Sequence, residues 1–114
     1  MTEKCRILIV DDHPIVQEGI QTLLEKEPSF EVLGIASNGR EAVEMTQTLK
    51  PDIVILDIAM PGTDGLSVAS QLHESSDPAK ILVYSMTANK EYVSAFFRIG
   101  VNAYVLKEDP ISAL

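Results

Sequence analysis

Four short apolar runs recur along this chain, and they constrain the fold more than any other feature of the sequence. The runs cover residues 6–10, 53–56, 81–84 and 103–106 and are rich in β-branched side chains. They are continuous rather than alternating, which is typical of strands that are covered on both faces. A more mixed fifth segment, residues 30–35, suits an edge strand. The pattern therefore predicts one largely buried sheet.

Stretches of helical length lie between these runs. The first has Pro14 in its first turn, where proline is favoured, and an apolar stripe along one face. The second begins with Asn38 and Glu41, which form a capping-box pattern. The expected helices cover residues 14–24, 38–50, 64–74 and 89–100. Strands and helices that alternate at this spacing predict an α/β fold with a parallel sheet and helices on both faces.

The length of 114 residues corresponds to one domain on a scale of roughly 100–200 residues per domain. We therefore expect residues 1–114 to be a single domain. Pro110 begins a segment that stops at Leu114, so we expect a fifth helix that the chain end truncates, and a longer parent protein.

The net charge of −8 limits the binding partners of this chain. DNA, RNA and anionic membranes would repel such a domain, whereas a metal ion or a cationic partner would be attracted. No apolar run approaches the roughly 20 residues of a membrane helix. The single cysteine, Cys5, permits no internal disulfide and is interpreted as a small core residue. These features favour a reducing compartment, most simply the cytoplasm.

Polar residues follow four of the predicted strands at the point where each strand ends. Because ligands bind beyond the carboxyl ends of the strands in an open parallel sheet, these side chains are expected to share one site. The residues are Asp11 and Asp12, Asp57, Ser85 and Lys107.

Each of these residues alone has an ordinary explanation, since an aspartate after a strand often caps a helix or begins a turn. Together they are harder to explain, because three neighbouring carboxylates repel one another and need a cation. Lys107 supplies one positive charge, and a hard divalent ion such as Mg²⁺ would supply the rest. Such a site suits phosphoryl chemistry, with an outward carboxylate as the nucleophile.

These residues give the chain a close resemblance to the receiver domain of bacterial two-component response regulators. The resemblance rests on the acid pair Asp11–Asp12, on Asp57 within the segment LDIAMPGTDG, and on Ser85, Tyr104 and Lys107. It spans nearly the whole chain. The segment DDHPIV at residues 11–16 is similar to the subfamily with a C-terminal helix-turn-helix domain of the LuxR type. The resemblance implies a flavodoxin-like, doubly wound, five-stranded parallel sheet of order 2-1-3-4-5.

The resemblance also implies a set of roles for the site. Asp57 would accept a phosphoryl group, and Lys107 would pair with that group. Asp12, Asp57 and the backbone carbonyl of Ala59 would ligate Mg²⁺ directly, with Mn²⁺ as a substitute, whereas Asp11 would act mostly through a bound water.

Signalling would depend on two further positions. Ser85 and Tyr104 would move together and report phosphorylation. The implied partners are a sensor histidine kinase, a C-terminal DNA-binding domain outside this chain, and a second copy in a homodimer formed on phosphorylation. This domain itself would bind neither nucleic acid nor membrane and would catalyse only its own phosphorylation and dephosphorylation.

Three alternative functions compete with this interpretation. A phosphatase of the haloacid-dehalogenase type needs a second aspartate two residues after the nucleophile, where this chain has Ala59. A flavin-binding protein needs a phosphate loop after the first strand, where the acid pair would repel phosphate. A degenerate receiver that binds partners without phosphorylation stays open. His13 and His73 lack the spacing of a zinc site, and a surface position is expected for both.

Overall fold

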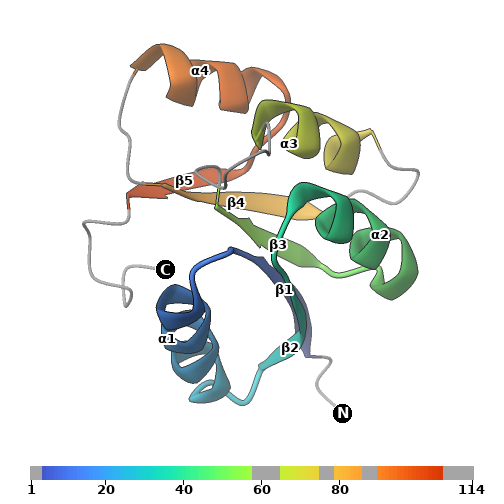
Figure 1. Cartoon of the computed structure of the whole chain (residues 1–114), viewed down its shortest axis with the longest axis vertical. Coiled ribbons are helices and arrows are strands. Elements are labelled where there is room, and N and C mark those ends of the chain that lie inside the picture. Colours follow the sequence, from blue (N-terminus) through green and yellow to red (C-terminus); the bar gives the residue numbers. More distant parts are fainter. Residues whose placement is uncertain (1–3, 58–64, 75–78, 86–89, 107–114) are drawn as a thin grey trace.

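The computed structural model describes residues 4–57, 65–74, 79–85 and 90–106 (Figure 1). The predictions for Ala59, for Lys107 and for a fifth helix lie outside these residues. The described elements, in chain order, are β1 (Cys5–Val10), α1 (Pro14–Glu25), β2 (Phe30–Ala36), α2 (Gly39–Leu49), β3 (Ile53–Leu56), α3 (Gly65–His73), β4 (Lys80–Ser85), α4 (Lys90–Arg98) and β5 (Ala103–Leu106).

All five strands form one parallel sheet in the order β2-β1-β3-β4-β5. Figure 1 shows α1 on one face of the sheet and α2, α3 and α4 on the other. The fold class and strand order expected from the sequence are confirmed. The strand order reverses between β1 and β3, and a crevice for ligands forms at such a switch point.

Two apolar cores cover the two faces of the sheet. On the face of α1, the buried side chains of Ile20 and Leu24 pack against Ile7, Ile9 and Ile55. The core on the opposite face is larger and contains Phe96, which is fully buried. Successive side chains of a strand point to opposite faces, so β1 divides its apolar residues between both cores. This double burial explains why the central strands are continuous apolar runs.

The helix signals of the sequence correspond to observed backbone geometry. The side chain of Asn38 accepts a hydrogen bond from the backbone N–H of Glu41 at 2.8 Å, which confirms the expected cap of α2. Proline is the first residue of α1, as expected. Among the described residues, no helix combines the length and apolar character that a bilayer crossing needs.

The outermost strand β2 contains an irregularity that the sequence did not predict. Pairing with β1 runs from Ile7 opposite Val32 to Leu8 opposite Gly34, so Leu33 is an extra residue on β2. A Cβ atom at Gly34 would lie 2.7 Å from Cε of Met45, so the end of that flexible side chain would have to shift. Glycine at this point leaves room for the Met45 side chain of α2 beside the bulged strand.

Candidate functional site

The two buried acids of the candidate site extend directly from the central strands. The backbone N–H of Asp11 donates to the carbonyl of Ala36 at 3.0 Å, and that of Asp57 donates to the carbonyl of Val10 at 2.8 Å. Both residues thus continue the sheet hydrogen bonding one position past the ends of β1 and β3. Each is only 1% exposed. The strand ends therefore fix both carboxylates at the switch point of the sheet.

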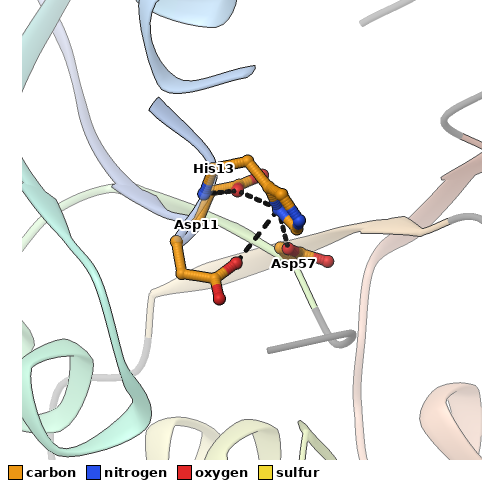
Figure 2. A group of neighbouring side chains, drawn as sticks. Asp11, His13 and Asp57 are labelled. Carbon is orange, nitrogen blue, oxygen red and sulfur yellow. Dashed lines mark hydrogen bonds and ion pairs between the residues drawn. The ribbon is translucent and has the colours of Figure 1, made fainter. Parts of the chain in front are cut away.

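The loop after β1 adds two more polar groups to the same place. Asp12 is the more accessible acid, with 28% of its side chain exposed. The imidazole Nδ1 of His13 lies 3.0 Å from Oδ1 of Asp12 and 3.1 Å from Oδ1 of Asp11. It lies 3.6 Å from Oδ2 of Asp57. Figure 2 shows the ring of His13 pointing toward the carboxylates of Asp11 and Asp57.

The loop is held in this shape by its own hydrogen bonds. The backbone N–H of His13 donates to Oδ1 of Asp11 at 2.7 Å. From the first turns of α1, the amide Nε2 of Gln17 donates to the backbone carbonyl of Asp11. His13 precedes Pro14, and its extended backbone (φ −97°, ψ 110°) is the conformation that a following proline favours.

The structure therefore brings together Asp11, Asp12 and Asp57, as the sequence predicted. Ser85 is the last residue of β4, where its backbone is paired with Leu106. That places it at the same edge of the sheet as the acids, because parallel strands all end on one side. Tyr104 lies in β5, and its ring meets that of Phe96 edge-on, with centroids 6.1 Å apart and planes at 62°.

His13 is the residue of this cluster that the sequence reasoning set aside. A surface position was expected, and the side chain is indeed 55% exposed, but its ring nitrogen faces three carboxylates. The signal that was missed is the position of His13 in the sequence. A histidine that directly follows a pair of acids at a strand end is close enough to reach the same site. Zinc-type spacing says nothing about a site built by strand ends, where residues distant in sequence meet.

The donor set fits a divalent metal ion. Asp11, Asp12, His13 and Asp57 each offer one ligand atom, and these four atoms all lie within 4.8 Å of one another. Three carboxylates are the ligands that hard cations such as Mg²⁺ prefer, and a cation also offsets their mutual repulsion.

Comparisons with known proteins agree with this geometry. The response regulator receiver domain family matches residues 7–114. The nitrate/nitrite response regulator protein NarL of Escherichia coli K12 is 37% identical over 116 residues, which cover 98% of this chain and 54% of NarL.

Solved structures of receiver domains superpose closely on this one. The signal receiver domain of the response regulator NarL from Mycobacterium tuberculosis has a TM-score of 0.89 at 32% identity, covering 96% of this chain and 89% of that one. A DNA-binding response regulator of the LuxR family from Staphylococcus aureus has a TM-score of 0.87 at 28% identity, covering 96% and 91%.

This chain belongs to the receiver domain family of two-component response regulators. Its relatives and structural neighbours include response regulators of the LuxR family, as the segment after β1 indicated. The chain spans about half the length of the curated relatives it matches, 54% of NarL and 47% of the transcriptional regulatory protein DegU of Brevibacillus brevis.

Proposed function

We propose that this domain is a phosphorylation switch in which Asp57 accepts a phosphoryl group from the phosphohistidine of a sensor histidine kinase. The observation that carries the proposal is the position of Asp57, buried at the end of the central strand β3 with Asp11 and Asp12 beside it. Membership of the receiver family supports the same role.

The proposed transfer conserves atoms and charge. A carboxylate oxygen of Asp57 attacks the phosphorus atom, and an oxygen–phosphorus bond forms as the phosphorus–nitrogen bond of the donor breaks. The donor imidazole leaves with the bonding electron pair and takes a proton from solvent. When bound, Mg²⁺ or Mn²⁺ neutralises the phosphoryl oxygens and lets them approach the acids. Asp12, Asp57 and the carbonyl of Ala59 would hold the ion directly, and Asp11 would act through a water.

Two further residues complete the proposed phosphoryl site. Lys107 pairs its ammonium group with the phosphoryl oxygens, and the hydroxyl of Ser85 donates a hydrogen bond to one of them. Movement of Ser85 toward the phosphoryl group would vacate space beneath α4. Tyr104, which already contacts Phe96 of α4, would turn inward to fill that space. The surface of α4 and β5 would then change shape, which is a population shift between two packings.

The proposed output is transcriptional. The relatives, about half of whose length this chain covers, include proteins named as response regulators or transcriptional regulators. We therefore propose that residues 1–114 are the receiver domain of a longer cytoplasmic regulator that carries a C-terminal DNA-binding domain. Phosphorylation would promote homodimer formation. The receiver itself, with its net charge of −8, would be repelled by nucleic acid and would not bind it.

Intact-mass measurement with acetyl phosphate tests the phosphoacceptor assignment. With Mg²⁺ present, the wild-type protein is expected to gain the mass of one phosphoryl group, and chelation of the metal should abolish the gain. Asp57→Asn keeps the shape of the side chain and removes the nucleophile, so it should gain nothing. A wild-type protein that stays unmodified while binding Mg²⁺ would indicate a receiver that acts without phosphorylation. Equal labelling of Asp57→Asn would place the phosphoryl group elsewhere.

A further inference from the structure

The position of the His13 ring resembles that of a metal ligand. In an octahedral site with bonds of about 2.0–2.1 Å, neighbouring donor atoms lie about 3.0 Å apart. Nδ1 of His13 is 3.0 Å and 3.1 Å from oxygens of Asp12 and Asp11, and 3.6 Å from an oxygen of Asp57. The 3.0 Å separation from the oxygen of Asp12, a proposed direct ligand, is that of adjacent donors around one ion, and the oxygens of Asp11 and Asp57 lie somewhat farther from the ring nitrogen.

The backbone, rather than the core, directs the ring into the site. The hydrogen bond from the His13 N–H to Asp11 orients the residue, and Pro14 limits its backbone to extended conformations. The side chain caps no helix N–H group. The side chain is 55% exposed, so the ring lies between the two buried acids and solvent.

We propose that His13 contributes Nδ1 as a nitrogen ligand to the metal ion, and that it shifts the preference of the site from Mg²⁺ toward borderline ions such as Mn²⁺. The inference rests on the proposed function, because it concerns the metal ion of the same phosphoryl site. Imidazole suits first-row transition metals, whereas Mg²⁺ prefers an all-oxygen shell. The phosphorylation of the receiver would consequently depend on which divalent ion is available.

Electron paramagnetic resonance of bound Mn²⁺ tests the nitrogen ligand directly. Untagged protein is used, because the chain then holds only the two imidazoles of His13 and His73. Spin-echo modulation from directly coordinated nitrogen is expected in wild-type protein and in His73→Gln, and it should vanish in His13→Ala. Bound Mn²⁺ without nitrogen modulation, or modulation that survives in His13→Ala, would overturn the proposal.

Competition between the two ions tests the selectivity at one fixed pH. His13→Ala should lower the affinity for Mn²⁺ about tenfold or more, a typical cost of losing groups that support a metal site, with a much smaller change for Mg²⁺. Equal losses for both ions would show that His13 only shapes the loop, and would overturn the proposal. Circular dichroism of His13→Ala checks that the substitution, at a half-exposed position, leaves the fold intact.

The two proposals fail in different ways. If wild-type protein bound neither Mn²⁺ nor Mg²⁺, the metal dependence of the proposed phosphoryl transfer would fall together with the role of His13. If Asp12→Ala lost both ions while His13→Ala kept the wild-type preference, only the nitrogen ligand would be excluded.

Discussion

At the scale of single residues, the site combines two buried acids with the partly buried Asp12 and the exposed His13. Asp11 and Asp57 are fixed by the ends of strands, so their places follow from the apolar runs that precede them. Asp12 and His13 belong to the loop, and His13 is held there by hydrogen bonds of its backbone N–H and its ring nitrogen with Asp11. Strand-end positions are therefore predictable from sequence, whereas the direction of the His13 ring needed the structure.

Cys5 offers a test of residue environment away from this site. Burial raises the pKa of the Cys5 thiol, the nearby carboxylate of Asp52 raises it further, and Lys80 opposes the shift. A raised pKa means that the folded protein holds the thiol proton more tightly than the unfolded chain does. This contribution to stability is present below the unfolded pKa, about 8.5, and is lost as the pH rises through the folded value.

Alkylation of Cys5 by iodoacetamide across a pH series reports this shift. The midpoint of the rate profile should lie at higher pH in native protein than in urea-unfolded protein, because only the thiolate reacts. Coincident midpoints would contradict the effect of burial. Cys5→Ser, which leaves no thiol, provides the background rate.

At the scale of elements, the turn between α4 and β5 depends on a close contact with α3. Gly100 has a φ of +107°, and a Cβ atom there would overlap the ring of His73 at the end of α3. Gly100→Ala should therefore destabilise the fold by about 1–3 kcal/mol, from backbone strain and overlap together. Urea unfolding measures the loss.

A double variant separates the two causes of that loss. Gly100→Ala combined with His73→Ala removes the overlap but keeps the unfavourable φ, so it should recover only part of the stability. Gly19→Ala in α1 is the comparison, since alanine in a helix interior is favoured by about 0.5–1 kcal/mol over glycine. An unchanged midpoint for Gly100→Ala would contradict the strain.

The proposed switch is also an element-scale property, because it links the end of β4 to α4 and β5. Ser85→Ala keeps the nucleophile and the metal ligands, so it should still accept phosphate. It should transmit phosphorylation poorly to α4 and β5. The contacts with the phosphoryl group must favour one packing by a few kcal/mol, and the variant lacks the hydrogen bond of the Ser85 hydroxyl. The measurement is NMR of α4 and β5 with and without beryllofluoride. Wild-type shifts in the Ser85→Ala protein would mean that another loop carries the signal.

Elements were predictable from sequence to within a residue or two, but their exact ends were not. The strand after α3 begins at Lys80 and ends at Ser85, one residue beyond the apolar run at each end. Hydrogen bonding continues past apolar side chains, so such ends cannot be read from hydropathy. The bulge opposite Leu8 was not foreseen, although an isolated glycine such as Gly34 inside a strand often marks one.

At the scale of the whole molecule, the proposed metal binding would be coupled to folding. The acids come together only in the folded sheet, so an ion that binds them stabilises the native state alone. At a hundredfold excess of Mg²⁺ over its Kd, the gain is about 2.7 kcal/mol. Urea unfolding with and without Mg²⁺ should show this gain in wild-type protein and a much smaller one in Asp12→Ala.

Glu44→Ala is the matched control for that experiment. Glu44 is an exposed acid of α2 whose partner is Arg40, so its loss also changes the net charge by one but leaves the site intact. It should keep the full response to Mg²⁺. An equal response from Asp12→Ala would argue for general screening of negative charge rather than a specific site.

The bulge in β2 has a consequence for how copies of this molecule meet one another. An outermost strand presents unpaired backbone groups on which a second chain can add its own strand, which is a common start of aggregation. The extra residue at Leu33 interrupts the even spacing of those groups midway along β2. A strand of a second chain could therefore not form an uninterrupted series of backbone hydrogen bonds along β2. The irregularity beside Gly34 is therefore expected to disfavour the addition of a second chain along β2.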